Sequence, residues 1–276
     1  MEYKKTERGI EIKIGKCLDL KNTFECGQCF RWNENADGSF SGIVGDRYAR
    51  IYRDGEFIVI ENADESDYHI WERYLDLDEC YDEMRKAIVS LDSRLECAVS
   101  SIDGIRILRQ EPWEALCSFI ISQNNNIPRI KGIVERLCKN FGDEIENGYT
   151  FPSAERLAFL SADDLAPLRA GFRARYIIDA AGKVSSGEVE LEKMYSAPLE
   201  ECRKELMKIT GVGAKVAECT LLYGFHRLEA FPVDVWMKKA LSTLFSGISP
   251  ENLGRYAGLA QQYIFHYSRL NPETVK

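Results

Sequence analysis

The sequence predicts an α+β protein, in which an N-terminal antiparallel β-sheet domain is followed by a mainly helical domain. Residues 10–63 alternate apolar and polar side chains and contain turn signals, which indicates β-strands. From about Ser66 to about Leu270, apolar residues recur at helical spacing instead. We therefore expect a β-rich domain with flanking helices over residues 1–105 and a helical domain over residues 106–276. The 276 residues suffice for one large core or two modest ones.

Strands are predicted where the β pattern is densest. Isoleucine occupies every second position of residues 10–14, between charged residues, as in a half-buried strand. Two β-rich runs, residues 48–53 and 56–60, flank Asp54-Gly55, which is a strong hairpin signal. Asp37-Gly38 predicts another turn. These features favour a small antiparallel sheet.

The clearest helix is predicted to open at Glu111-Pro112-Trp113, because proline is favoured in the first turn of a helix. Apolar residues then follow at helical spacing until three asparagines at 124–126 interrupt the pattern. Pro128 opens the next helix, and the rest of the chain is typical of short helices with polar joints.

The charge is acidic overall but uneven along the chain. A formal net charge of −8 and a pI of about 5.2 argue mildly against nucleic acid as a partner, because phosphate binders are usually basic. Residues 54–83 are densely acidic, with Arg73 as their only Lys or Arg. Two basic clusters favour a local binding face, although a solvated helix surface is the simpler interpretation of each. They comprise Arg129, Lys131, Arg136 and Lys139 in one, and Arg169, Arg173 and Arg175 in the other.

The nine cysteines indicate reduced thiols, because their number is odd and no secretory signal precedes them. Cys26 and Cys29 form the only CxxC pair, and a structural zinc site usually needs four ligands. No cysteine follows Cys219, which excludes an iron–sulfur loop near the C-terminus. We expect no metal and no cofactor. No apolar run approaches the roughly 20 residues that span a bilayer, so we expect an intracellular protein without a membrane partner.

The chemically informative segment runs from residue 206 to Asp234. An apolar helix leads into Gly211-Val212-Gly213, and a second helix is predicted to start there. Glycines permit close approach of a partner, and the exposed amides of the new helix can hold a phosphate. A tight turn between helices without any ligand remains the alternative for these three residues.

Lys215 is predicted in the first turn of this second helix, beside apolar residues. Desolvation and the positive end of the helix both disfavour the charged ammonium, which is how a lysine becomes a nucleophilic amine. A snorkelling surface lysine is the alternative. Asp234 precedes another helical run, where it is expected to cap that helix and is able to serve chemistry as well.

These residues resemble a known family. Residues 211–215 together with Pro232-Val-Asp234 are similar to the helix-hairpin-helix, glycine-proline-aspartate (HhH-GPD) superfamily of DNA glycosylases. Further segments narrow the resemblance to the 8-oxoguanine DNA glycosylases, and it covers about residues 10–270. Those segments are residues 27–32, 119–129, 134–138, 171–176 and 256–265.

The resemblance implies a bifunctional enzyme that excises 8-oxoguanine from double-stranded DNA and also has AP lyase activity. The base is flipped out, because its sugar carbon cannot be reached inside the stack. Lys215 attacks C1′ and forms a Schiff base, from which the strand is cleaved by β-elimination. Asp234 stays ionised and stabilises positive charge on the sugar. The resemblance further implies a monomer in the cytoplasm of a prokaryote, associated with the nucleoid.

The resemblance also implies a set of base-recognition residues. Gly27 offers its backbone carbonyl to the N7–H group that 8-oxoguanine has and guanine lacks. Gln261 reads the edge of the base, while Phe265 and Cys219 sandwich its ring.

Four other residues are implied to act on the rest of the duplex, with a preference for cytosine opposite the lesion. Asn124, Arg129 and Arg173 hold the cytosine that is left behind. Phe172 wedges the duplex at a position where better-known members carry tyrosine.

Two positions depart from the family pattern. Trp236 occupies the place of a histidine that contacts the phosphate next to the flipped nucleotide, and Ser268 that of an aspartate that supports this histidine. Because both differ together, we expect the phosphate contact to be rebuilt.

Three other functions are alternatives to this one. A monofunctional alkyl-base glycosylase keeps the aspartate but lacks the lysine, so Lys215 argues against it. The endonuclease III type normally carries an iron–sulfur cluster, and this chain lacks the cysteines for it. A non-catalytic module that only binds phosphate needs no pair such as Lys215 and Asp234.

Overall fold

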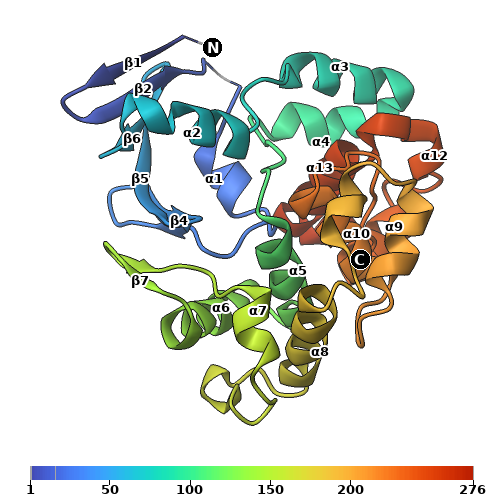
Figure 1. Cartoon of the computed structure of the whole chain (residues 1–276). Helices are drawn as coiled ribbons and strands as arrows, with labels where there is room; N and C mark the ends of the chain where they lie inside the picture. Colours follow the sequence, from blue (N-terminus) through green and yellow to red (C-terminus); the bar gives the residue numbers. More distant parts are fainter. Residues whose placement is uncertain (1, 16, 276) are drawn as a thin grey trace.

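The computed structural model describes residues 2–15 and 17–275, and it confirms the predicted α+β class. The N-terminal part is one antiparallel sheet in the strand order β1-β2-β6-β5-β4-β3. In Figure 1 the sheet lies apart from the helices of the C-terminal half, and α5 runs through the middle of the molecule between them. The strands are β1 (Tyr3–Thr6), β2 (Gly9–Lys13), β3 (Asn33–Glu34), β4 (Phe40–Val44), β5 (Arg47–Asp54) and β6 (Phe57–Glu61). A separate pair consists of β7 (Glu144–Ile145) and β8 (Gly148–Tyr149).

The predicted hairpin at Asp54-Gly55 is confirmed. Asp54 of β5 pairs with Phe57 of β6, and Gly55 adopts a φ of +60°, a conformation that glycine reaches without steric cost. The strand predicted at residues 10–14 is β2, which pairs with both β1 and β6. It is more buried than the alternation indicates, because Glu11 is only 5% exposed. Arg8 at 2.6 Å and Lys4 at 3.1 Å compensate its charge.

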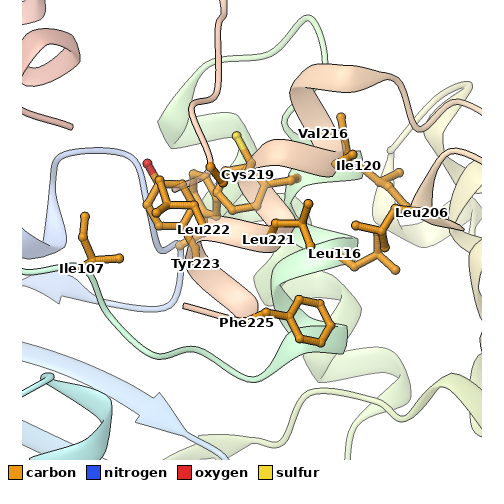
Figure 2. Close-up of a cluster of buried hydrophobic side chains, with 14 of the residues drawn as sticks. Ile107, Leu116, Ile120, Leu206, Val216, Cys219, Leu221, Leu222, Tyr223 and Phe225 are labelled. Carbon is orange, nitrogen blue, oxygen red and sulfur yellow. The ribbon is translucent and has the colours of Figure 1, made fainter. Parts of the chain in front are cut away.

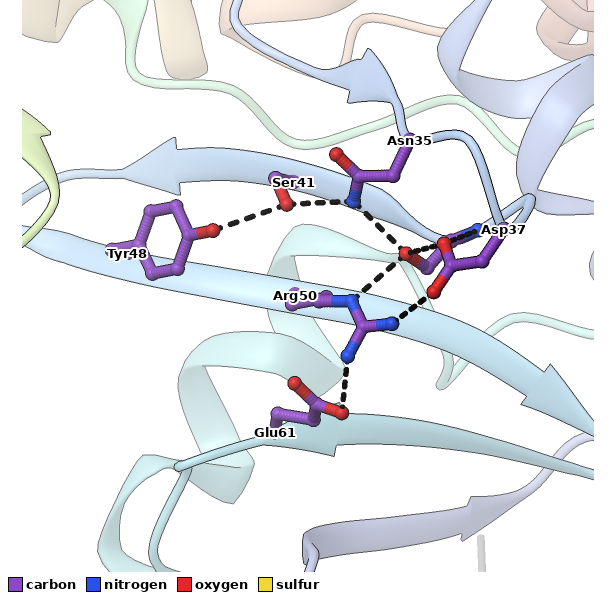
Figure 3. Close-up of polar contacts among 7 residues, drawn as sticks. Asn35, Asp37, Ser41, Tyr48, Arg50 and Glu61 are labelled. Atoms are coloured by element: carbon purple, nitrogen blue, oxygen red, sulfur yellow. Dashed lines mark hydrogen bonds and ion pairs between the residues drawn. The ribbon is translucent and has the colours of Figure 1, made fainter.

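A polar network joins the central strands β5 and β6 to the predicted Asp37-Gly38 turn (Figure 3). Arg50 of β5 donates to Ser39 at 2.9 Å and to Glu61 of β6 at 2.7 Å, and it also pairs with Asp37. Hydrogen bonds from Ser39, together with Arg50, lower the pKa of the Asp37 carboxyl to about 2. The turn is therefore fixed by charge-assisted bonds on the face of the sheet that is exposed to water.

Helices make up most of the remaining chain, as predicted. The helix expected at residue 111 is α5, which Glu111 caps, and the helix expected at Pro128 is α6, which Asn126 caps. The α-helices are α1 (Leu20–Phe24), α2 (Tyr68–Tyr74), α3 (Tyr81–Leu91), α4 (Glu96–Ser101), α5 (Pro112–Ile121), α6 (Ile127–Phe141), α7 (Ala154–Ala158), α8 (Arg173–Ser185), α9 (Leu199–Leu206), α10 (Ala214–Gly224), α11 (Val235–Ser242), α12 (Pro250–Leu253) and α13 (Ala257–Leu270). Short 3₁₀ helices are η1 (Glu65–Asp67), η2 (Ser93–Leu95), η3 (Ala166–Leu168), η4 (Leu191–Tyr195), η5 (Gly254–Tyr256) and η6 (Pro272–Val275).

Two hydrophobic cores divide the molecule. One joins the sheet to α1 and α2, and Leu108 returns to it from later in the chain. The other is built by the C-terminal helices and also takes Tyr81, Ile88 and Val99 from α3 and α4. Helices α3 and α4, which precede residue 105, therefore pack with the helical part, and the division of the chain at residue 105 stays a prediction.

Candidate active site

The site is built on α10, which packs against α5 in the centre of the helical core. Leu116 and Ile120 of α5 lie beside Val216 and Leu221 of α10, as Figure 2 shows. Burial of such aliphatic side chains stabilises each by about 1.5–3 kcal/mol and holds the helix rigidly. Lys215 lies in the first turn of α10, two residues after the N-cap residue Gly213, which confirms its predicted place.

The Lys215 side chain is half-buried over an aromatic floor. Its Nζ donates to Ser122 Oγ at 3.1 Å and lies 5.1 Å from the centre of the Phe119 ring. Cys219 follows one helical turn later, and burial raises the pKa of its thiol to about 11, although Lys215 opposes this shift. The thiol therefore stays neutral near pH 7. The amine donates to a neutral hydroxyl, and no carboxylate of the described residues pairs with it.

Asp234 is the N-cap of α11, as expected. Its Oδ1 accepts a hydrogen bond of 2.8 Å from Met237 N, which leaves the second carboxylate oxygen outside the cap. The preceding loop is tied to α10, because Glu218 accepts from Phe231 N at 2.6 Å and is itself paired with Arg203. This buried carboxylate fixes the loop that carries Asp234 to the helix that carries Lys215.

Lys215 and Asp234 line one pocket of about 380 Å³. Gly27 and Phe265, both predicted to recognise the base, line the same pocket from distant parts of the chain. This pocket is not distinguished by its volume, because a pocket near Glu190 is larger, at about 620 Å³. That larger pocket has no Lys, Arg or His in its lining. The smaller pocket brings together the predicted nucleophile Lys215, the carboxylate of Asp234 and aromatic walls.

Gly27 adopts a φ of +87°, a region that other residues rarely enter. A β-carbon at this position would lie 3.4 Å from Phe265 Cε1, so the backbone and the ring are in close proximity. Gln261 lies one helical turn before Phe265 on α13 and is 4% exposed. Its Oε1 has no hydrogen-bond partner among the described residues, which is costly unless a ligand supplies a donor.

The predicted hairpin joins α9 to α10 and is anchored on α8. Gly211 has a φ of +81°, and a β-carbon there would lie 2.3 Å from a ring atom of Tyr176. Asp179 of α8 accepts from Thr210 N at 2.7 Å. Val212 is buried, while Gly213 caps α10 without any side-chain acceptor for its first amides. These free amides form an anion-binding end of the helix.

The comparisons with known proteins agree with this geometry. Residues 10–116 match the 8-oxoguanine DNA glycosylase N-terminal domain, and residues 117–253 match the HhH-GPD superfamily of base excision DNA repair proteins. The N-glycosylase/DNA lyase of Saccharomyces cerevisiae is 34% identical over 83% of this chain and 70% of its own length. The chain belongs to the 8-oxoguanine DNA glycosylase family.

Solved structures extend the similarity to the whole fold. The 8-oxoguanine glycosylase/lyase of Clostridium acetobutylicum, bound to DNA with cytosine opposite 8-oxoguanine, is 36% identical with a TM-score of 0.93 over 99% of both chains. MBOgg1 bound to a low-affinity DNA ligand is 41% identical with a TM-score of 0.91, covering 99% of this chain and 100% of its own. The predicted family and its base excision repair chemistry are thereby confirmed.

The residues that this glycosylase was predicted to use on the opposite strand lie around the loop between α5 and α6. Asn124 is exposed with a φ of +46°, Arg129 is exposed in the first turn of α6, and Phe172 is 41% exposed. Arg173 is only 3% exposed, and it donates to the carbonyls of Gln123 at 2.8 Å and Asn124 at 2.9 Å. Arg173 thus holds the loop, and its contact with a cytosine stays a prediction.

The two departures from the family pattern lie at the pocket and behind it. Trp236 lines the pocket and is 37% exposed, with Lys239 Nζ 6.0 Å from its ring. Ser268 is fully buried and donates to Ile264 O of its own helix at 2.7 Å. Ser268 is therefore bonded within its own helix, and no hydrogen bond joins it to Trp236 among the described residues.

Only part of each basic cluster is tied to backbone carbonyls, while Arg129, Lys139, Arg169 and Arg175 are exposed. Arg136 donates to Leu168 O at 3.0 Å and 2.9 Å, and Lys131 donates to Trp32 O. Arg129 is exposed to solvent. Burial lowers the pKa of Arg173, and the nearby positive charge of Arg129 lowers it further. The face offered to a polyanion is therefore narrower than the count of basic residues indicates.

The CxxC pair is buried in the sheet domain. Cys26 donates to Thr23 O at 3.2 Å and Cys29 to Phe24 O at 3.5 Å, and burial raises the pKa of Cys26 to about 12. In the part of the chain that the structure describes, no three His, Cys, Asp or Glu side chains gather as a metal site would require. None of the helices described is long and apolar enough to cross a bilayer.

Sequence reasoning missed three residues that shape the site: Ser122, Glu218 and Arg269. Ser122 is the C-cap of α5, just before the run of asparagines. This polar segment predicts a loop, but it does not predict that Ser122 bonds to Lys215. Glu218 follows Lys215 by three residues, which places it near the same helix face, yet its partner Phe231 N lies in a separate loop. Arg269 lines the pocket one turn after Phe265 and carried no signal of its own.

Proposed function

We propose that this protein excises 8-oxoguanine from duplex DNA through a Schiff base on Lys215 and then cleaves the abasic strand. The observation that carries the proposal is that one pocket gathers Lys215 and Asp234 with Gly27 and Phe265. An amine and a carboxylate at a pocket with aromatic walls suit attack on a sugar carbon beside a stacked base. The DNA-bound 8-oxoguanine glycosylase/lyase of Clostridium acetobutylicum, similar over 99% of the chain, supports the assignment of the substrate.

In the proposed reaction the neutral amine of Lys215 attacks C1′ while the C1′–N9 bond breaks. The base leaves with the bonding electron pair and takes up a proton, and the sugar ring opens to give an imine with Lys215. Removal of a C2′ proton then expels the 3′ phosphate by β-elimination. No step is a net oxidation or reduction, so this reaction needs no redox cofactor. Ser122, which accepts from Lys215 at 3.1 Å, orients the amine before the attack.

Asp234 has the electrostatic role in this scheme. Positive charge develops on the sugar as the C1′–N9 bond weakens, and a carboxylate that lines the same pocket stabilises it. The cap bond to Met237 N fixes one oxygen of this carboxylate, so the group is oriented before the substrate arrives. Such preorganisation is the usual source of large electrostatic effects in active sites.

Recognition of the base is assigned to Gly27, Gln261, Phe265 and Cys219. The carbonyl of Gly27 accepts from the N7–H group of 8-oxoguanine, and guanine has no hydrogen there. Gln261, whose Oε1 is buried without a partner among the described residues, accepts from the amide edge of the base. The flat ring is held between Phe265 and Cys219, two residues on α13 and α10.

We further propose that cytosine is preferred opposite the lesion. We also propose that the protein acts as a monomer, and that it works on nucleoid DNA in the reducing cytoplasm of a prokaryote. Arg129 is exposed beside Asn124 and Phe172 and offers only donors, which suits the two acceptors of cytosine. The free cysteines fit a reducing compartment. The amides of Gly211 and Gly213 are assigned to a phosphate of the lesion strand. The Val212 amide, which the sequence also assigned to this phosphate, donates instead to Ile209 O at 3.0 Å.

The test is incubation of the purified protein with a duplex that contains a single 8-oxoguanine opposite cytosine. Hot alkali reveals every site of base loss, whereas strand cleavage without alkali reports only the lyase step. We expect base loss at the lesion and none in the matched guanine duplex. Binding of both duplexes without base loss in either would instead support the non-catalytic DNA-binding module.

A further inference from the structure

Arg269 is a pocket residue to which the proposed mechanism gives no role. It lies on α13 one turn after Phe265, and its guanidinium carbon is 5.6 Å from the centre of that ring. One of its terminal nitrogens lies 3.7 Å from where a β-carbon of Gly27 would be. Stacking on an aromatic face holds the planar guanidinium in place at a modest energy.

The hydrogen-bonding capacity of Arg269 is almost unused. Among the described residues its one hydrogen bond is a contact of 3.5 Å from Nη1 to Glu25 O, at the outer limit for such a bond. No carboxylate of residues 2–15 and 17–275 forms an ion pair with it. A guanidinium has five donors and stays charged at any physiological pH, so most of its donors are available to a ligand.

The pocket contains little other positive charge. Lys215 is the second basic residue of its lining, and Lys215 must be neutral when it attacks the sugar. Trp236, which occupies the position of the family's phosphate-binding histidine, carries no charge and accepts no proton. Arg269 is therefore the one permanent cation in the lining of this pocket.

We propose that Arg269 binds a backbone phosphate of the flipped nucleotide and so supplies the positive charge that Trp236 lacks. This rests on the proposed function, which puts a nucleotide in this pocket. A phosphate fits better than the base, because a planar fork of donors matches two phosphate oxygens and an uncompensated cation gains most from an anion. The base edges are already served by the Gly27 carbonyl and by Gln261.

The experiment measures binding to a duplex with one tetrahydrofuran abasic analogue, which carries the phosphates but no base and cannot be excised. Each phosphate contact contributes about 0.9 to the slope of log K against log salt concentration. For Arg269→Gln we expect this slope to fall by about 0.9 and the affinity at 0.1 M salt to fall roughly tenfold, because bonds to charged groups are strong. Arg269→Lys, which keeps the charge, should restore the slope.

Arg255→Gln is the matched control. Arg255 stacks on Tyr256 at 4.7 Å but lies outside the pocket lining, so its loss should leave the slope unchanged. Weaker binding by Arg269→Gln with an unchanged slope would mean a merely structural role and would overturn the proposal. A loss confined to duplexes with an 8-oxoguanine base would assign Arg269 to the base and overturn it too. Because the abasic duplex contains no oxidised base, this result is independent of whether 8-oxoguanine is the substrate.

Discussion

Replacing Asp234 by asparagine separates the two roles that the structure gives this residue. The N-cap bond from Met237 N, at 2.8 Å, is kept because asparagine presents a carbonyl oxygen of the same shape. The loss of negative charge at the helix N-terminus costs only about 0.3–1 kcal/mol. We therefore expect the melting temperature to fall by no more than about 2–4 °C.

Base excision should respond far more strongly than stability. Removing one preorganised group that stabilises the transition state typically costs about 2.7–4 kcal/mol, which corresponds to a rate lower by about 10²–10³. The assay is single-turnover excision of 8-oxoguanine with enzyme in excess, read after alkali, beside thermal unfolding of the same protein. Excision that stays within about threefold of wild type, which is under roughly 1 kcal/mol of barrier, would show that Asp234 is only a cap.

Two control variants sharpen this measurement. Asp19 caps α1 in the sheet domain with a bond of 2.7 Å from Asn22 N, so Asp19→Asn repeats the change of charge at a helix outside the pocket. Its excision rate should equal that of wild type. Asp234→Ala removes the cap as well, and should unfold more easily by about 0.5–2 kcal/mol without a further large loss of excision.

Four further predictions follow from the site. Borohydride should trap a covalent complex with lesion DNA; Lys215→Gln should abolish it while binding persists, and full trapping by this variant would remove the lysine from its role. A substrate analogue without the N7 hydrogen should be excised at least roughly tenfold more slowly, because the Gly27 carbonyl is left unpaired at a cost of about 1–3 kcal/mol; equal rates would mean that another group selects the base. Wild-type excision measured opposite all four bases should favour cytosine, by up to about 1–3 kcal/mol. Arg129→Ala should reduce that preference. Equal wild-type rates opposite all four bases would refute the preference, and an unchanged preference in the variant would show that Arg129 does not read the cytosine. Gly211→Ala should unfold more easily by at least about 1–2 kcal/mol, since its φ of +81° disfavours a side chain and a β-carbon would lie 2.3 Å from Tyr176; calorimetry that finds wild-type stability would contradict this.

The features that could be predicted from sequence are those with local causes. The hairpin at Asp54-Gly55, the cap at Asp234 and the first-turn position of Lys215 each depend on residues a few positions apart. Backbone preferences and capping bonds of this kind act over one turn, so the chain displays them in its own order. The resemblance to the glycosylase family rests on the same local motifs, and it names Lys215, Asp234, Gly27 and Phe265, which line one pocket.

Tertiary structure alone decided how these residues meet. Ser122 accepts from Lys215 across 93 residues, and Arg269 reaches Glu25 across 244. No local pattern encodes such pairs, because they form only when α5, α10 and α13 pack around one core. The burial of Arg173 under the loop at Asn124 likewise could not be predicted from the sequence, because a run of basic residues has the same composition whether its side chains face water or carbonyl groups. Short-range chemistry can be inferred from the chain itself, whereas burial and long-range hydrogen bonds are set by the packing of the whole molecule.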